Sequence, residues 1–470
     1  ENARASRAAT ERRGACETAE YRILFCGSAT VGHHRLLRAE AGRTPNLDRL
    51  AQEGTLFLNA YTCQPVCGPA RACLQTGRYA TEVGCFRNNI HLPHDVKTLA
   101  DYLNENDYET AYVGKWHLAS STKQGIDHQR TAIPEEYRGG YRYYWMAADV
   151  LEFTSHGYNG YVFDGENRKH EFIGYRADCI NNYAIDYLHH RKTEKPFFLF
   201  ISQIEPHHQN DHNRFEGPDG SKERFREYEV PGDLAGTEGD WRENYPDYLG
   251  QCHSLDENVG RLIDTLKAAG EWENTIFIYT SDHGSHFRTR NREYKRSCHD
   301  GCTHIPLIIH GPGFNRSEKI DRMVSLLDLP STILDCAQIP VPADFQRFSL
   351  KRLVQGEAGE WPEVIFMQIS ENQVGRAIRT PEWKYSVRAD ADGIADSGAD
   401  VYYEDCLYDL KHDPFERTNL ANDPNFAQTR AQLAELLKQQ MKIAGEACPQ
   451  ILPWNAEVSQ GTGEIDWTRI

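Results

Sequence analysis

The stretch PFFLFISQIEPHH, residues 196–208, contains an unbroken apolar run from Phe197 to Ile201 that ends in polar residues, among them His207 and His208. A short run without polar alternation is typical of a strand buried on both faces of a mainly parallel sheet. Ligands of such sheets bind beyond the carboxyl ends of the strands. The two histidines are therefore candidate functional residues.

The same pattern recurs along the chain. Four further apolar runs end abruptly in polar residues, namely YRILFCGSAT (21–30), ETAYVGKWHL (109–118), NTIFIYTSDHG (274–284) and HIPLIIHGPG (304–313). Amphipathic helical patterns separate the runs, as in TPNLDRLAQEG, VKTLADYLNEN and SLDENVGRLIDTLKAAG. This alternation predicts an α/β fold, in which helices flank a large, mainly parallel sheet. The strand ends carry Lys115, His117, His207, Asp282 and His283.

The pattern changes near residue 360. The stretches GRAIRTPEWKYSVRAD (375–390) and YYEDCLYDLKHDPFERTNLAND (402–423) predict short antiparallel strands joined by polar turns. An amphipathic helix is expected over 426–445, with leucines on one face. We therefore predict an N-terminal tail over 1–20, a large domain over 21–359, and a smaller α+β domain over 360–470.

The charge balance excludes some classes of partner. The chain has 52 Lys and Arg against 69 Asp and Glu, a formal net charge of −17. Such a surface repels nucleic acid, so we expect no nucleic-acid partner, and an anionic substrate would need a local basic cluster. The stretch HFRTRNREYKR (286–296) supplies one. No apolar run approaches the ~20 residues that span a bilayer, so no membrane partner is expected.

The 13 cysteines include no C-x-x-C pair, and most are expected to be buried as small apolar residues. In CQPVCGPARACLQTGRYATEVG (63–84), a disulfide from Cys63 to Cys67, a metal site, a nucleophile and a packed cysteine are all open from the residues alone. A zinc site is a further alternative for Cys298, His299, Cys302 and His304. The C-x3-C spacing without a distant partner pair disfavours it.

The motifs together resemble the sulfatase family. Cys67, Pro69 and Arg71 match its C-x-P-x-R core, and Thr76-Gly77-Arg78 follows. The stretches GKWHL, EPHH, TSDHG, EYKRSCHDGCTHIPLIIHGPG and LYDLKHDPFERTNLA come in the family's order, so the resemblance covers roughly residues 43–425. It implies an alkaline-phosphatase-like fold and hydrolysis of sulfate esters by the domain over 21–359.

The resemblance also implies the chemistry. Cys67 would be oxidised to formylglycine by a formylglycine-generating modification enzyme, and the hydrated aldehyde is a geminal diol. One hydroxyl would attack sulfur to form a covalent sulfo-enzyme intermediate, and loss of the second proton would expel sulfate. A serine could not leave in this way. The implied catalytic set is Cys67, Arg71, Lys115, His117, His207, Asp282 and Lys295.

Roles follow for the members of this set by analogy. Arg71 would hold the diol, and Lys115 and Lys295 would bind the sulfate oxygens. His117 would remove the proton during elimination. His207 would contact the sulfate or protonate the leaving oxygen, which requires a pKa near the working pH. Asp282 would touch both a metal and the attacking hydroxyl.

The resemblance implies a calcium ion held by Asp282, His283 and an Asp pair after the first strand. Here Ala29 and Thr30 occupy the positions of that pair, and neither supplies a carboxylate oxygen. Two interpretations stay open. The segment 1–42 is altered relative to the natural chain, or this protein binds its metal weakly or not at all.

The expected substrate is a sulfated carbohydrate, because a tyrosine-rich segment over 137–165 and the basic cluster over 286–296 suit sugar rings and anionic groups. The candidate substrate-binding residues are His156, His208, Arg288 and Arg290. The alternatives are a phosphonate or phosphate ester hydrolase on the same scaffold, and an inactive sulfate-sugar-binding protein with unmodified Cys67. The family resemblance implies a periplasmic or secreted location.

Overall fold

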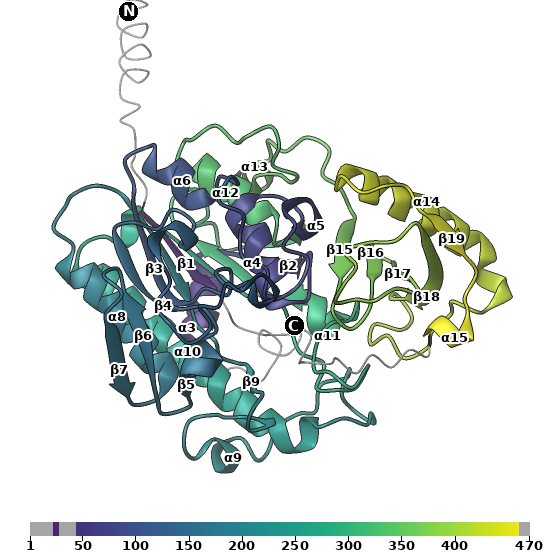
Figure 1. Ribbon diagram of the computed structural model, residues 1–470, viewed down its shortest axis with the longest axis horizontal. Helices are drawn as coiled ribbons and strands as arrows, with labels where there is room; N and C mark the ends of the chain where they lie inside the picture. Colours follow the sequence, from purple (N-terminus) through teal and green to yellow (C-terminus); the bar gives the residue numbers. More distant parts are fainter. Residues whose placement is uncertain (1–21, 28–43, 460–470) are drawn as a thin grey trace, which may run out of the picture.

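The structure, a computed structural model, describes residues 22–27 and 44–459 (Figure 1). The predicted tail over 1–20 and the positions Ala29 and Thr30 lie outside the described residues. A large α/β region is followed by a smaller C-terminal sheet that lies beside it with its own helix (Figure 1). Across the described ranges, no helix combines the length and apolar character that a bilayer crossing requires.

A twelve-stranded sheet forms the centre of the large region. Its five middle strands are all parallel and run in the order β11 (Thr275–Thr280), β1 (Arg22–Gly27), β8 (Phe197–Ser202), β3 (Glu109–Lys115) and β4 (Tyr144–Ala148). The carboxyl ends of these strands therefore meet at one edge of the sheet. The predicted α/β fold is confirmed.

The outer strands are mostly antiparallel. The run HIPLIIHGPG belongs to them, because it is split at Pro306 into β12 (His304–Ile305) and β13 (Leu307–His310), and β13 pairs antiparallel with β11. The remaining outer strands are β2 (Thr55–Tyr61), β5 (Ser155–His156), β6 (Asn159–Asp164), β7 (Lys169–Ile173) and β14 (Glu318–Ser325). An apolar run shows that a strand is buried and leaves its direction open, so this difference lies beyond the sequence pattern.

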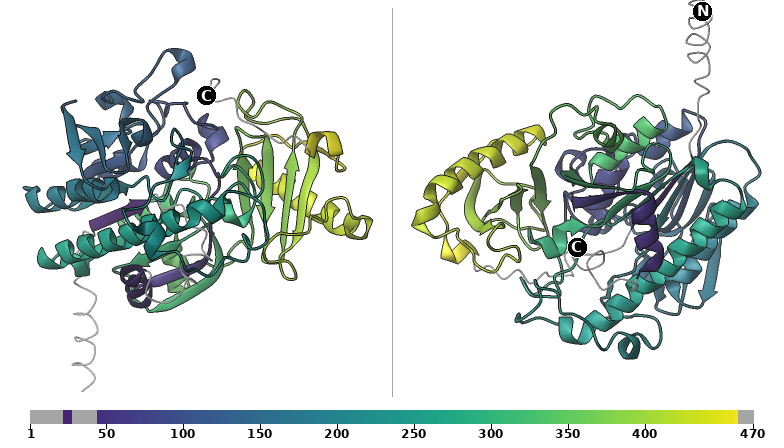
Figure 2. Two further views of the ribbon diagram at one scale, coloured as in Figure 1. Left: turned by 90° about the horizontal axis from the view of Figure 1, so that it is seen from below. Right: turned by 180° about the vertical axis from the view of Figure 1, so that it is seen from behind.

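Helices cover both faces of the sheet (Figure 2). One core contains residues of α3 (Pro45–Glu53), α8 (Arg176–His190) and α10 (Trp241–Ala268). The opposite core contains residues of α4 (Cys67–Thr76), α6 (Leu99–Asn104), α12 (Asp328–Cys336) and α13 (Leu350–Gln355). In β8, Leu199 and Ile201 join the first core, while Phe198 and Phe200 join the second. Burial on both faces explains why this strand is an unbroken apolar run.

The C-terminal region is a five-stranded sheet with a helix packed on it. The strands β15 (Ile365–Ile369), β16 (Gly375–Arg379), β17 (Trp383–Arg388) and β18 (Val401–Asp409) pair antiparallel in chain order, and β19 (Gln450–Leu452) pairs parallel to β18. Helix α14 (Ala427–Ile443) buries Leu433, Leu437 and Met441 against this sheet. The α+β character predicted for this region is confirmed.

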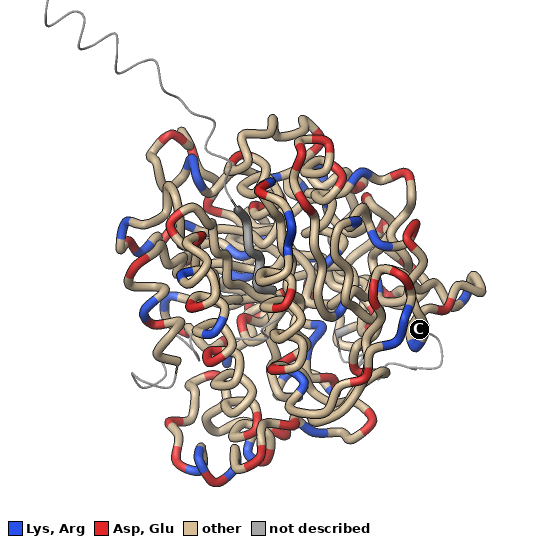
Figure 3. Tube along the Cα trace, turned by 90° about the vertical axis from the view of Figure 1, so that its left-hand side faces the viewer, with Lys and Arg blue, Asp and Glu red and all other residues tan. Residues whose placement is uncertain are grey.

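Short elements connect these parts. They are α5 (Ala80–Val83), α7 (Leu151–Thr154), α9 (Ser221–Arg224), α11 (Asp300–Thr303), α15 (Ala456–Ser459), β9 (His208–Gln209) and β10 (Arg214–Phe215). On the side drawn in Figure 3, acidic and basic residues are interspersed along the trace. The cationic side chains that matter for an anionic ligand are instead gathered inside the molecule, at the edge where the parallel strands end.

Candidate active site

Cys67 is the first residue of α4, and its side chain is 2% exposed. The backbone N–H of the next residue, Gly68, donates to Asn88 Oδ1 at 2.9 Å. The helix ends at Gly77, which adopts a left-handed conformation with φ of 71°. A side chain at Gly77 would meet the ring of Phe345 at 2.6 Å, so the turn after the helix requires glycine. These features hold the cysteine at a helix N-terminus.

Cationic groups surround the Cys67 thiol. Lys295 Nζ lies 2.9 Å from Sγ, and His283 Nε2 lies 3.0 Å from it. Burial raises the pKa of the thiol, but the charges of Lys115, Lys295 and His283 outweigh burial and lower that pKa well below its ordinary value. The surroundings of residue 67 therefore stabilise negative charge on its side chain.

Arg71 lies one helical turn after Cys67 and is buried beneath it. Its guanidinium donates to the carbonyl of Lys115 at 2.9 Å and to Ser202 Oγ at 2.5 Å. It also forms an ion pair of 3.3 Å with Asp282. Burial alone would raise the pKa of the Asp282 carboxyl, and the positive charges of His283 and Arg71 bring that pKa below its usual value. Asp282 therefore remains an anion inside the site.

A second chain of contacts links Lys115 to His207 through a carboxylate. Glu152 Oε2 lies 4.0 Å from Lys115 Nζ and 3.4 Å from His207 Nδ1. The other ring nitrogen of His207 lies 3.2 Å from the hydroxyl of Tyr294. Burial is the main cause that lowers the pKa of His207 to about 4, and the repulsion of Lys115 adds to it. The imidazole is thus neutral in the free protein at pH 7.

Glu152 and Tyr294 were missed in the sequence. Tyr294 directly precedes Lys295, so the sequence indicates that it lies near the site but not what it does there. Glu152 stands in the tyrosine-rich segment, and no spacing relates it to the strand ends.

His117 occupies a strained position just past the end of β3. Its φ is 60°, a left-handed backbone conformation that residues other than glycine rarely adopt. Its backbone N–H donates to the carbonyl of Asp149 at 2.8 Å. The side chain lines the same cavity as Cys67. Such strain is characteristic of functional positions, because the surrounding fold must hold the residue there.

These residues open into a cavity of about 470 Å³. The predicted residues that line it are Cys67, Lys115, His117, His207, His208, Arg288 and Lys295, whereas Arg71, Asp282 and His283 lie behind Cys67. Amide side chains complete the lining, from Asn88, Asn89, Gln129, Asn210 and Asn213. The structure thus brings the predicted catalytic set together around residue 67, while the role of each member stays a prediction.

Two of the expected substrate-binding residues lie elsewhere. His156 is half-exposed and pairs with Asp211 at 2.8 Å, and its ring stacks on His212. The guanidinium of Arg290 donates to the carbonyl oxygens of Phe415 and Glu416 at 2.7 and 2.6 Å. Neither residue lines the cavity, so the structure does not support a substrate contact for either one. Aromatic and basic runs also supply surface contacts and contacts between the two regions, so a substrate contact by His156 or Arg290 stays a prediction.

The described residues do not fit a calcium site. Asp282 and His283 offer one carboxylate and one imidazole, with the Cys67 thiol within 4.8 Å. Calcium takes about six to eight oxygen ligands. The single carboxylate already pairs with Arg71, and the positions Ala29 and Thr30 lie outside the described residues. Among the described residues, Lys115, Lys295 and Arg71 supply positive charge at this site.

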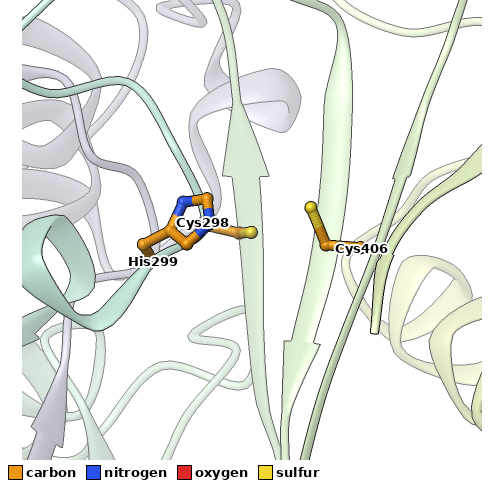
Figure 4. A group of neighbouring side chains, drawn as sticks. All are labelled: Cys298, His299 and Cys406. Atoms are coloured by element: carbon orange, nitrogen blue, oxygen red, sulfur yellow. The ribbon is translucent and has the colours of Figure 1, made fainter. Parts of the chain in front are cut away.

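The other cysteines form contacts of their own. Cys63 neighbours Cys73, and Cys63, Cys67 and Cys73 are all free thiols, so the disulfide from Cys63 to Cys67 is not formed in the structure. Cys298 and Cys406 face each other across the boundary between the large region and the C-terminal sheet, with His299 beside them (Figure 4). Both ring nitrogens of His299 already have partners, Ser297 Oγ at 3.1 Å and the Tyr408 hydroxyl at 3.0 Å.

The four residues considered for zinc do not converge. Cys302 Sγ lies 3.8 Å from Ser297 Oγ, and the ring of His304 stacks on Tyr61. The cluster that does form, Cys298, His299 and Cys406, offers only three ligands, and both ring nitrogens of its imidazole are already hydrogen-bonded. It therefore does not make the four-ligand site that structural zinc requires.

The sequence and the fold of the chain are similar to those of known proteins. The sulfatase family model matches residues 25–339, and that of the N-sulphoglucosamine sulphohydrolase C-terminal region matches residues 292–443. The chain is 26% identical to an N-acetylglucosamine-6-O-sulfatase of Bacteroides thetaiotaomicron, over 85% of this chain and 82% of the relative. It is 28% identical to a ulvan-active sulfatase of Formosa agariphila, over 90% and 84%.

A solved structure shares the fold. It is that of a protein in complex with its substrate, D-glucosamine-2-N,6-O-disulfate, with a TM-score of 0.71 and 22% identity. The superposition covers 91% of this chain and 98% of that one.

Proposed function

The chain belongs to the sulfatase family of sulfuric ester hydrolases, and from this premise we propose that it hydrolyses a sulfate ester of a carbohydrate through a formylglycine formed at Cys67. One observation carries the proposal. The side chain of residue 67 stands at a helix N-terminus, against Lys295 and close to Lys115, and opens into a cavity that also holds His117 and His207. A sulfate group in contact with residue 67 would therefore lie among cations.

The first step forms the sulfo-enzyme intermediate. One hydroxyl of the hydrated aldehyde attacks sulfur, the bond between sulfur and the leaving oxygen breaks, and the leaving alcohol takes up a proton. Asp282 is an anion behind residue 67 and is placed to accept the proton of the attacking hydroxyl. Lys115 and Lys295 stabilise the charge that develops on the non-bridging oxygens.

His207 must gain its proton on substrate binding. Its pKa of about 4 leaves it neutral in the free protein, partly because Lys115 and Lys295 repel a positive charge there. An anionic sulfate ester between these lysines would offset that repulsion and raise the pKa of His207 toward the working pH. The imidazole could then protonate the leaving oxygen, and a substrate without negative charge would not activate it.

The second step regenerates the aldehyde. His117 removes the proton of the remaining hydroxyl, the carbonyl re-forms, and sulfate leaves with the oxygen that attacked. Water then rehydrates the aldehyde, so each turnover consumes one water molecule. Arg71 holds residue 67 in place through both steps, because its guanidinium is fixed by Ser202 and Asp282.

A sulfated sugar suits the remainder of the cavity. Five amide side chains and Arg288 line it, and such groups hydrogen-bond sugar hydroxyls and anionic substituents. The relatives named as sulfatases of N-acetylglucosamine and ulvan support this class. We further propose export to the periplasm or medium, where sulfated polysaccharide fragments would be met.

A substrate screen tests the proposal. The modified protein is assayed on sulfated N-acetylglucosamine and sulfated oligosaccharides, on 4-nitrophenyl sulfate, and on the matched phosphate esters. We expect kcat/KM to be highest on a sulfated sugar. A preference for the aryl sulfate contradicts the carbohydrate assignment, and faster hydrolysis of phosphate esters contradicts the sulfatase activity.

A further inference from the structure

We propose that Glu371, at the loop that follows β15 of the C-terminal sheet, is a positioning residue for the active site. Its carboxylate contacts both segments that converge on the sulfate-binding end of the cavity, one near Cys67 and one next to Lys295. This inference rests on the proposed function for its kinetic consequence, whereas the structural coupling stands without it.

The first contact reaches the segment of Lys295. The adjacent residue, Arg296, donates from Nε to Glu371 Oε2 at 2.6 Å, and both side chains are almost fully buried. Arg296 lines the cavity and has a left-handed backbone with φ of 71°. A charge-assisted bond inside the protein is stronger than one in water and holds this unfavourable conformation in place. The Arg296–Glu371 pair therefore fixes the backbone next to Lys295 and, with it, the direction in which the Lys295 side chain points.

The second contact reaches the segment of Cys67. Glu371 Oε1 accepts the backbone N–H of Asn88 at 2.7 Å. The side chain of Asn88 in turn accepts the backbone N–H of Gly68 at 2.9 Å, directly after Cys67. One carboxylate thus fixes, through a single intermediate on each side, the nucleophile and the lysine that lies 2.9 Å from it.

The loop that carries Glu371 is itself firmly held. Glu371 has φ of 67°, and its N–H donates to the carbonyl of Gly393 at 2.8 Å. A side chain at Gly393 would approach the carbonyl oxygen of Glu371 to 2.8 Å, so the two loop segments that contain these residues lie in close contact. The neighbour Ser370 accepts a hydrogen bond of 2.8 Å from Gln64 Nε2. The C-terminal sheet therefore docks on the chain just before the nucleophile.

The charge of the carboxylate is essential to this arrangement. Two buried arginines face it, since Glu371 also offsets part of the cost of burying the Arg87 charge. An amide at this position could still accept one hydrogen bond, but it would remove the negative charge that offsets the burial of both guanidinium groups. Arg296 already forms a longer ion pair of 3.7 Å with Glu293, and without the Glu371 charge it would shift toward that carboxylate and take Lys295 with it.

The test compares Glu371→Gln with Glu446→Gln. Glu446 is a matched control, because it also joins the C-terminal sheet to the large region, pairing with Arg376 at 2.6 Å and accepting from Thr81 Oγ1 at 3.1 Å, yet it lies outside the cavity. Amide hydrogen exchange is followed by mass spectrometry in peptides that contain Gly68 and Asn88. Turnover of a sulfated sugar is measured in parallel, normalised to the fraction of residue 67 that is modified.

We expect Glu371→Gln to speed exchange at Gly68 and Asn88 and to lower kcat by at least tenfold with KM changed less than about threefold. Glu446→Gln should leave both readouts close to wild type. Unchanged exchange at Gly68 and Asn88, or a kcat within about twofold of wild type, overturns the role of Glu371. If the wild-type protein hydrolyses no ester, the proposed function fails, and the exchange measurement still decides the coupling.

Discussion

Replacing Lys295 by methionine should separate catalysis from stability. The ammonium lies 2.9 Å from Cys67 Sγ, is 2% exposed, and has no carboxylate within ion-pair distance among the described residues. A charge about 4 Å from a sulfate oxygen contributes about 4 kcal/mol at an effective dielectric constant of about 20. Loss of one preorganised oxyanion donor costs about 3–4 kcal/mol in other enzymes. Both energies predict that kcat/KM of Lys295→Met falls by a factor of about 100 to 1,000.

The same substitution should not destabilise the fold. Methionine is similar in length and carries no charge. In the formylglycine-modified protein, where residue 67 is no longer a thiol, Lys295→Met removes a buried cation that has no carboxylate within ion-pair distance among the described residues. Lys384→Met is the contrasting control. Lys384 is buried between Asp300 and Glu416, and its loss leaves two carboxylates without their cation.

Calorimetry and steady-state kinetics check both expectations. The Tm of Lys295→Met should equal or exceed that of wild type, whereas the Tm of Lys384→Met should fall. A Lys295→Met variant that retains kcat/KM within about tenfold refutes the electrostatic role of Lys295. A Tm of the modified Lys295→Met protein that falls as in Lys384→Met refutes the argument that Lys295 has no carboxylate partner.

Three further predictions concern the nucleophile, pH and metal. Cys67→Ser should react once and then stop, with one SO₃ group retained on the serine by intact mass; continued turnover contradicts the elimination step. Because the folded pKa of His207 is about 4 against an ordinary 6.5, its neutral form contributes stability that is full above pH 6.5 and is lost as pH falls toward 4. His207→Gln should therefore flatten the decline of Tm between pH 7 and 4, and an unchanged slope contradicts its burial as a neutral group. EGTA should leave the Tm of the protein unchanged, while Ala29→Asp with Thr30→Asp should introduce a calcium-dependent rise in Tm; a large loss of Tm in EGTA without substitution contradicts the ligand set described.

The site was predictable where the fold itself gathers residues. Lys115 is the last residue of β3, whereas His207 and Asp282 follow β8 and β11, and the carboxyl ends of these parallel strands meet at one edge of the sheet. An apolar run that ends in a polar residue therefore predicts that this residue lies at the edge of the sheet where the site is formed. The direction of β13 was not predictable, because a buried antiparallel strand has the same apolar pattern as a parallel one.

Other parts of the site depend on contacts between distant segments. Glu152 comes from a short helix and Glu371 from the C-terminal sheet, and no local spacing relates either to Cys67. The basic run over 286–296 could not reveal which arginines face the cavity. Arg288 does, whereas Arg290 is held by two backbone carbonyls of the segment around Phe415.

Mass spectrometry of the peptide that contains residue 67 tests the central claim most directly. The protein is produced together with a formylglycine-generating enzyme and digested, and the peptide mass is compared with that of the encoded cysteine. Conversion of the thiol to an aldehyde predicts a peptide about 18 Da lighter, in a fraction that tracks the specific activity. An active preparation in which residue 67 remains entirely a thiol would contradict the account.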